Sequence, residues 1–351
     1  MTWLRNKTIS TMNVRRLFKR TRQKVLLFIL TTISGILFLC TGMATVFFWG
    51  PSVDISCYLL YNNYSLPMLR ENESLPVRSI FFIEPSCVSN LTSRQSCAIE
   101  SAAKSNPNWQ INVIFSGMSF QTAHNLTQFK KSKNIKFWKI NIEEFTKETL
   151  FEELVTSGIL KRCLWGVERT QDVLKYLMLR KWGGIHIDLD MIVARSFGSL
   201  ARNWATRENE EEMADGIIGL SQDRIGTLVA ESAIRNIKSN YKSRNWCKTR
   251  RLQVINGILQ GLCSTTDTKF MSSITCNGFE VYGSQFFYPI LQKSSRDFFT
   301  PGEIRNHNAY TYYLGGHDTK GYKAKKTSPF TRLAKKYCPK TYVLYKNQFG
   351  S

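Results

Sequence analysis

The stretch "QDVLKYLMLRKWGGIHIDLDMIV", residues 171–193, joins a helical pattern to a strand pattern. Apolar side chains recur at helical spacing over residues 172–182, and the Gly183–Gly184 pair ends that pattern. The "IHIDLDMIV" that follows is an apolar run typical of a buried strand, yet it contains Asp188 and Asp190. A helix leading directly into a buried strand is typical of an α/β sheet covered by helices.

The same alternation extends over much of the chain. We predict strands at 77–84, 109–117, 134–140, 185–193 and 214–220, and helices at 92–107, 172–182, 228–237 and 252–262. Strands and helices that alternate over short connections predict one α/β domain rather than separate all-α and all-β parts.

The two aspartates raise an electrostatic problem. Residues two apart on a strand point to the same face, so Asp188 and Asp190 are expected side by side, with Leu189 and Met191 opposite. A hard divalent cation such as Mn²⁺ or Mg²⁺ removes the repulsion and keeps coordination positions for phosphate oxygens. The alternative is a solvated turn, because Asp-x-Asp is common by chance. The apolar flanks favour a metal site that binds a nucleotide diphosphate.

The N-terminal part predicts a membrane anchor. Residues 1–24 contain eight Lys or Arg and no acidic residue, and residues 25–49 contain no charged residue at all. At ~1.5 Å per residue, the second segment matches a hydrocarbon core of about 30 Å. A cleaved signal peptide is the alternative, but its apolar part has only ~7–15 residues. We therefore predict a cytoplasmic tail (1–24), a signal-anchor (25–49), a lumenal stem (50–76) and a globular domain (77–351).

Two further features agree with a lumenal domain. N-glycosylation sequons occur at Asn63, Asn72, Asn90 and Asn125, all after the anchor. The eight cysteines outside the apolar run allow up to four disulfides, in a pairing that the sequence leaves open: Cys57, Cys87, Cys97, Cys163, Cys247, Cys263, Cys276 and Cys338. No Cys-x-x-Cys motif or Cys/His cluster is present, so structural zinc is not expected.

The net charge of +22 requires a nucleic-acid-binding protein to be considered. The anchor and the sequons argue against it, because they place the basic domain on the side of the membrane away from nucleic acid. Positive charge there suits an anionic ligand, such as a nucleotide diphosphate, and an anionic membrane surface.

Residues 171–193 resemble the signature of glycosyltransferases with a D-x-D sugar-binding region, and are most similar to the α1,4-galactosyltransferase and α1,4-N-acetylglucosaminyltransferase family. Supporting segments follow in the family's order: "FFIEPS" (81–86), "RQSCAIESAAKSNP" (94–107), "FFYPI" (286–290) and "AKKYCP" (334–339). The resemblance implies a GT-A-like, Rossmann-type nucleotide-sugar-binding domain in a type II Golgi membrane protein. It also implies transfer of galactose or N-acetylhexosamine from a UDP-sugar to a glycolipid, such as a lactosylceramide-like glycosphingolipid, or a glycoprotein. The linkage would be α1,4, formed with retention.

The resemblance also implies roles for particular residues. Asp188 and Asp190 match the metal-binding pair, and Asp215 is a candidate acceptor-binding or catalytic carboxylate. Residues expected to bind the donor are Glu84, Asp172, Lys175, Gly183 and Gly184. Lys175 stands where the family has arginine, so it keeps the charge but loses the bidentate fork. For the glycine pair, a simple helix stop remains an alternative.

Besides Lys175, the chain departs from the family pattern at other positions, three of which are close to the proposed site in the family pattern. Gln171 replaces a serine, and His186 replaces a tyrosine and is expected to be a packed strand residue rather than a ligand. Tyr312 stands near a position where a histidine could complete the metal shell, which leaves His307, His317 or water as substitutes. The altered region around Tyr312 supports a second hypothesis, a catalytically weakened homologue that acts as a glycan-binding or glycosyltransferase-partner protein.

Overall fold

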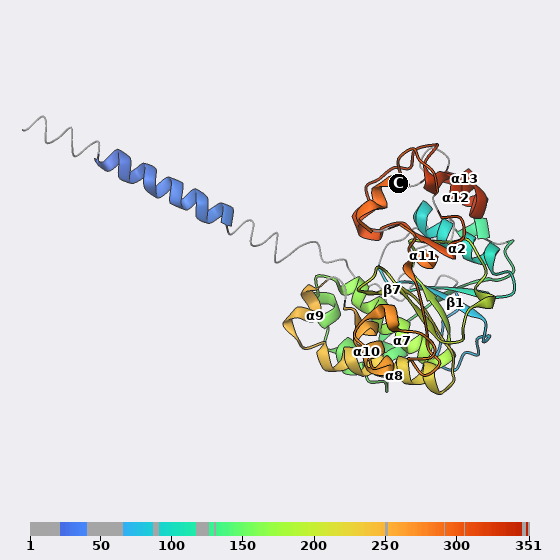
Figure 1. Cartoon of the computed structure of the whole chain (residues 1–351). Helices are drawn as coiled ribbons and strands as arrows, with labels where there is room; N and C mark the ends of the chain where they lie inside the picture. The colour runs from blue at the N-terminus through green and yellow to red at the C-terminus, as the bar shows by residue number, and fades with distance from the viewer. Residues whose placement is uncertain are drawn as a thin grey trace, which may run out of the picture. The chain divides into compact units, whose positions relative to one another are not determined.

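The computed structural model describes residues 22–40, 66–86, 91–116, 126–129, 131–249, 252–290, 292–304, 306–345 and 349. The chain divides into two compact units, Met1–Ser52 and Val53–Ser351. In the first unit, helix Arg22–Cys40 is long and apolar enough to cross a membrane, and its side chains are exposed along its length (Figure 1). The remainder of the predicted anchor, residues 41–49, lies outside the described residues.

A seven-stranded sheet forms the centre of the second unit, in the order β3-β2-β1-β4-β7-β6-β8. Its strands are β1 (Ser79–Glu84), β2 (Gln110–Phe115), β3 (Ile135–Lys139), β4 (Gly184–Ile187), β6 (Trp204–Arg207), β7 (Met213–Leu220) and β8 (Glu280–Tyr282). Only β7 runs against the others, because it pairs antiparallel with both β4 and β6 while the remaining pairs are parallel. The predicted α/β fold is confirmed.

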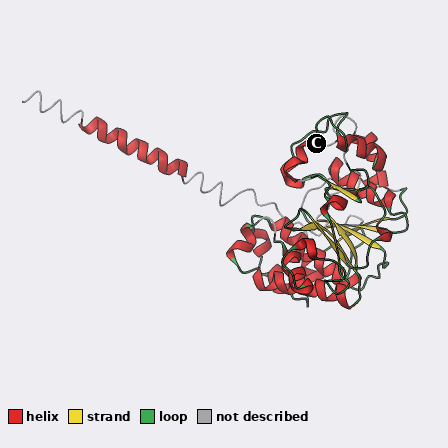
Figure 2. Cartoon of the chain, viewed as in Figure 1, coloured by secondary structure: helices red, strands yellow, loops and turns green. Residues whose placement is uncertain are grey.

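Helices cover both faces of this sheet (Figures 1 and 2). One layer contains α7 (Gly166–Trp182), α8 (Arg224–Asn240) and α10 (Val254–Cys263). The other contains α2 (Ser93–Ser105), against which α12 (Pro329–Tyr337) and α13 (Pro339–Tyr345) pack. Alternate residues of β1 serve the two layers: Phe81 and Ile83 join the core cluster of the first, and Ile80 and Phe82 that of the second. Short helices complete the unit: α4 (Ile142–Thr146), α5 (Glu152–Thr156), α6 (Ile159–Arg162), α9 (Arg244–Lys248) and α11 (Ser284–Phe287).

The single strand predicted over 185–193 is wrong. β4 ends at Ile187, a turn follows, and β5 (Met191–Val193) leaves the sheet to pair with β9 (Thr311–Tyr313). The backbone N–H of Asp188 still donates to the carbonyl of Gly216 in β7 (2.8 Å). The turn is closed by a hydrogen bond from the backbone N–H of Met191 to the carbonyl of Asp188 (3.3 Å). Both strands are buried, so apolar residues continue on either side of the turn. The hydrophobic pattern therefore gives no signal for the turn. Asp188 and Asp190 therefore meet at a turn, not on one strand face.

Three disulfides lie in the described part of the second unit: Cys97–Cys338, Cys163–Cys247 and Cys263–Cys276. Cys57 and Cys87 lie outside the described residues. All three core clusters also lie within residues 69–349. Because the unit contains its own core and these cross-links, Val53–Ser351 has what an independently folding domain needs.

Candidate active site

A cavity of about 480 Å³ opens where β1 and β4 end. Glu84 closes β1, Asp188 follows β4, and the first turns of α7 form the adjoining wall. The carboxyl ends of parallel strands are the usual ligand-binding edge of an open α/β sheet. Charged and polar side chains supply much of the wall: Glu84, Arg94, Gln95, Glu168, Arg169, Gln171, Asp172, Lys175, Asp188, Asp190, Glu208, Asp215 and Lys320.

Two side chains orient Asp188. The Nε2 of Gln171 donates to Asp188 Oδ1 (2.6 Å), and the Nε2 of His186 lies 3.1 Å from the same oxygen. Burial lowers the pKa of His186, so the neutral ring can donate through Nε2–H. Oδ2 lies against Gly216, where a Cβ would stand only 2.9 Å away. Gln171 and His186, which both depart from the family signature, thus lie within hydrogen-bond distance of the first aspartate. Sequence reasoning identified Gln171 only as a mismatch and missed this contact.

Asp190 lies against the C-terminal part of the chain. A Cβ at Gly316 would stand 2.5 Å from Asp190 Oδ2, and Gly316 and Tyr313 line the same cavity. The charge of Asp190 acts on Arg94, whose pKa burial lowers to about 10 while that carboxylate opposes the change. A buried arginine thereby provides positive potential beside the second aspartate.

The two carboxylates suit a hard cation. They supply anionic oxygens at one cavity wall, and the missing side chains at Gly216 and Gly316 leave space beside them. Among the described residues, no group of three His, Cys, Asp or Glu side chains could hold a metal ion. The donor set on this wall is therefore a pair, which fits an ion that also takes phosphate and water oxygens.

Tyr312 and the two histidines considered as a third metal ligand lie in different places. Tyr312 is buried away from the cavity, donates its hydroxyl to the carbonyl of Asn306 (2.5 Å) and packs against Phe298. Its neighbour Tyr313 lines the cavity instead, because alternate residues of β9 face opposite sides. His307 is exposed and is not among the lining residues, and the side chain of His317 lies outside the described part of the chain.

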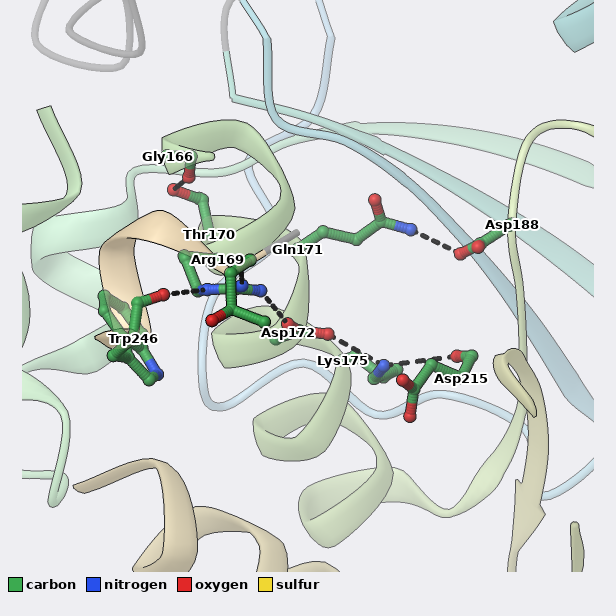
Figure 3. A network of polar contacts seen from close by, with 10 residues as sticks. Gly166, Arg169, Thr170, Gln171, Asp172, Lys175, Asp188, Asp215 and Trp246 are labelled. Carbon is green, nitrogen blue, oxygen red and sulfur yellow. Dashed lines mark hydrogen bonds and ion pairs between the residues drawn. The ribbon is translucent and has the colours of Figure 1, made fainter. Parts of the chain in front are cut away.

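A buried charge network forms the α7 wall (Figure 3). Asp172 accepts from Arg169 (3.1 Å) and from Lys175 (2.9 Å), one turn away on either side. Burial alone would lower the pKa of Lys175, but the charge of Asp172, with smaller contributions from neighbouring groups, raises it. The Lys175 ammonium also donates to the carbonyl of Asp215 (3.3 Å). Lys175 is thus held between protein groups and joins α7 to β7.

Arg169 also bonds this network to the segment around α9. Its Nε donates to the carbonyl of Trp246 (3.0 Å), and its guanidinium also bonds the carbonyl of Thr249. The Cys163–Cys247 disulfide links the same two segments, just before α7 and within α9. The start of the α7 wall is therefore cross-linked both covalently and by hydrogen bonds.

The remaining expected site residues divide into two groups. Glu84 lines the cavity, accepts from Ser86 and Gln95, and has its pKa raised by burial. Gly183 and Gly184 lie at the opposite end of β4 from Asp188, with φ of 65° and 103°. A Cβ at Gly184 would stand 2.5 Å from the carbonyl oxygen of Ser79. The glycine pair allows the turn and a close strand approach, and the structure does not bring it into the cavity.

Comparisons with known proteins agree with this arrangement. Residues 92–211 match the "Glycosyltransferase sugar-binding region containing DXD motif", which includes Asp188 and Asp190, and residues 224–345 match the "Alpha 1,4-glycosyltransferase conserved region". Lactosylceramide 4-alpha-galactosyltransferase of Rattus norvegicus is 23% identical over 307 residues, covering 81% of each chain. Alpha-1,4-N-acetylglucosaminyltransferase of Homo sapiens is 22% identical over 297 residues, covering 80% of this chain and 85% of the relative.

A solved structure of the galactosyltransferase LgtC, in complex with donor and acceptor sugar analogs, is 15% identical and has a TM-score of 0.42. It covers 74% of this chain and 96% of that one. The two family regions follow one another along the chain and together include the cavity-lining residues from Thr92 to Glu208 and from Leu252 to Lys320. The chain therefore belongs to the α1,4-galactosyl- and N-acetylglucosaminyltransferase family and is a glycosyltransferase.

Proposed function

We propose that the enzyme is a retaining hexosyltransferase that uses a UDP-sugar. It transfers galactose or N-acetylhexosamine in α1,4-linkage to the terminal sugar of a glycolipid, such as a lactosylceramide-like glycosphingolipid, or of a glycoprotein. One observation carries the proposal: two carboxylates, each beside a glycine, meet at the carboxyl edge of the sheet in a cavity of about 480 Å³. That arrangement suits a divalent cation with a nucleotide diphosphate.

In this proposal Asp188 and Asp190 hold Mn²⁺ or Mg²⁺. The ion, when bound, stabilises the negative charge that develops on the departing UDP. Gln171 and His186 fix the orientation of Asp188, since both lie within hydrogen-bond distance of its Oδ1. Asp190, which lies next to Gly316, would hold the ion together with Asp188.

The donor and acceptor lie on the charged wall between β1, α7 and β7. Asp172 and Lys175 serve the donor through their shared network, which keeps the α7 wall in one position, and Glu84 contacts the donor from β1. Asp215 lines the cavity and is the carboxylate proposed to act on the acceptor or in catalysis. UDP-sugars are α at the anomeric carbon, so an α-linked product requires retention.

The proposed cellular arrangement is a single-pass type II protein of the Golgi membrane. The tail (1–24) is cytoplasmic, the anchor (25–49) spans the membrane, and the stem (50–76) and catalytic domain (77–351) are lumenal. Helix Arg22–Cys40 supports the span, and the exposure of Asn72 supports a lumenal glycan. Glycosidase treatment should shift the gel mobility of the wild type, and Asn72→Gln should remove one step of that shift. An unchanged pattern of steps in this variant would contradict glycosylation at Asn72.

A donor screen tests the activity. Purified Val53–Ser351 is incubated with Mn²⁺, each common UDP-hexose or UDP-N-acetylhexosamine, and lactosylceramide or a glycoprotein acceptor, and UDP release is measured. We expect release with one donor class, dependent on acceptor, with an α-linked product by NMR. The Asp188→Asn/Asp190→Asn variant is the matched control. No release with any donor, together with no UDP binding, would favour the catalytically weakened homologue.

A further inference from the structure

The C-terminal part of the domain carries an unusual distribution of charge. Residues 319–345 contain eight Lys or Arg and no Asp or Glu, and the structure exposes all eight of these cations. Four lie in the loop before α12, from Lys320 at the cavity wall to Lys326. We call the exposed cations of residues 320–340 the C-terminal basic face.

The helices that follow extend this face. On α12, the apolar side is buried through Phe330, Leu333 and Ala334, and the exposed side presents Arg332, Lys335 and Lys336. Positions three and four apart lie on one side of a helix, so these three charges share the solvent face. The ammonium of Lys335 lies 5.4 Å from the ring centre of Tyr342, which brings the exposed side of α12 next to α13.

The cations of this face differ from those of the opposite helix layer in lacking acidic partners. On the α7–α8 side, Arg180 and Arg235 pair with Glu231, and Lys242 pairs with Glu153. In the part of the chain that the structure describes, none of the eight cations of the C-terminal basic face forms an ion pair. Unpaired charge of one sign on a fixed surface creates a field that attracts an anionic partner.

The face is also rigidly mounted on α2. Arg94 donates to the carbonyls of Thr319 and Tyr322 (2.7 and 2.6 Å), and Cys97 forms the disulfide with Cys338. The buried carboxylate of Glu100 accepts from the backbone N–H of Lys340 (3.0 Å) at the start of α13. Arg94, Cys97 and Glu100 are three residues apart in turn, so one side of α2 holds the whole segment.

Exposed apolar side chains lie beside these charges. Val343 and Leu344 on α13 are 61% and 57% exposed, three and four residues after Lys340. Cations next to exposed aliphatic side chains match a lipid surface, where charge meets head groups and apolar groups enter the interface. A soluble polyanion would have no use for the aliphatic pair.

We propose that the C-terminal basic face docks on the anionic surface of a lipid bilayer. The face begins with Lys320 at the cavity wall, so docking brings the mouth of the cavity toward molecules displayed on that surface. This inference goes beyond the proposed function and does not depend on it, because lipid binding can be measured without any transfer reaction.

Flotation of purified Val53–Ser351 with vesicles tests the proposal. Wild type should float with phosphatidylcholine vesicles that contain roughly 30% phosphatidylserine, not with pure phosphatidylcholine, and should be released at about 0.5 M NaCl. Each basic residue near such a surface is worth about fivefold in binding, so Lys323→Gln/Lys325→Gln/Lys326→Gln should weaken it by up to about a hundredfold.

A control with the same net charge separates the face from the general charge of the protein. Arg180→Gln/Arg235→Gln/Lys242→Gln removes three cations from the opposite helix layer and should change vesicle binding by less than about twofold. Equal losses in the two triple variants, or no binding of wild type to the anionic vesicles, would overturn the proposal.

A second pair of measurements separates a lipid from an acidic glycan. Val343→Asn/Leu344→Asn should weaken vesicle binding several-fold and leave retention on a heparin column unchanged, because only the bilayer accepts apolar side chains. If this variant binds vesicles like wild type while the lysine triple loses heparin retention, the partner is an acidic glycan and the membrane proposal is wrong.

Discussion

The two walls of the cavity are built in different ways. The α7 wall is local in sequence: Arg169, Asp172 and Lys175 follow one another at single-turn spacing, and Asp188 comes soon after in the same helix–strand unit. The C-terminal wall is remote: Thr319 and Tyr322 are bonded by Arg94, which lies 225 and 228 residues earlier. The α7 wall thus comes from a short stretch of chain, and the wall opposite comes from a distant one.

The first prediction concerns the point where the walls meet. Asp188→Asn or Asp190→Asn should lower transfer at least about a thousandfold, because each substitution removes one anionic oxygen donor from the pair proposed to hold the cation. Steady-state UDP release measures the effect. Unfolding midpoints close to wild type would show that the loss is chemical, whereas activity within a few-fold of wild type would remove the pair from the metal site.

The second prediction breaks the local wall. Lys175→Met should destabilise the domain by about 3–5 kcal/mol, because it leaves the carboxylate of Asp172 with only one of its two buried cationic partners. Denaturant unfolding measures this free energy. The matched control is Lys181→Met, which removes a partly exposed partner 3.9 Å from Glu71 and should cost less than about 1 kcal/mol. Similar values for the two variants would show that the network does not support the wall.

The two walls also mark how far the sequence could predict the site. The apolar periodicities of β1, β2, β3 and α7 predicted the α/β fold and the helix–strand unit that contains Asp172 and Asp188, because local patterns report local structure. The turn at Leu189 escaped prediction, since the strands on both sides of it are buried and the pattern runs on.

Long-range contacts could not be predicted in the same way. Nothing in the spacing of the cysteines selects Cys97–Cys338, and nothing in the "AYTYYLGGHD" segment indicates that Tyr313 rather than Tyr312 faces the cavity. That outcome depends on the antiparallel pairing of β5 with β9, which joins residues more than a hundred positions apart. The hypothesis of a weakened enzyme was built on Tyr312, a residue that the structure removes from the site.

The third prediction loosens the remote wall. Arg94→Met should destabilise the domain by about 2–3 kcal/mol, because three hydrogen bonds from a buried guanidinium to Thr319 and Tyr322 are lost. It should also raise the KM for the donor, since Gly316 and Tyr313 lie on that wall. Thermal unfolding and donor titrations measure the two effects. Arg180→Met, which removes an exposed arginine, provides the comparison. If the Arg94 and Arg180 variants have the same stability and the same KM for the donor, the C-terminal wall does not depend on Arg94.

The fourth prediction has the smallest expected effect and concerns Gln171 on the α7 wall. Gln171→Ala removes the 2.6 Å hydrogen bond to Asp188 and should lower transfer about tenfold, as is usual for a residue that orients a metal ligand. Stability should change little, because Gln171 is only partly buried. An apparent affinity for Mn²⁺ that weakens in step with activity would identify a positioning role. Lower activity with an unchanged metal titration would instead assign Gln171 a direct contact with substrate.

Calorimetric titration of UDP into purified Val53–Ser351, with and without Mn²⁺, tests the central claim most directly. A site in which Asp188 and Asp190 join the protein to a diphosphate through a cation predicts that UDP binds tightly with Mn²⁺ and weakly without it. It also predicts that the Asp188→Asn/Asp190→Asn variant loses this dependence on the metal. UDP binding that is equally strong without a divalent cation, or unchanged in the double variant, would contradict the account.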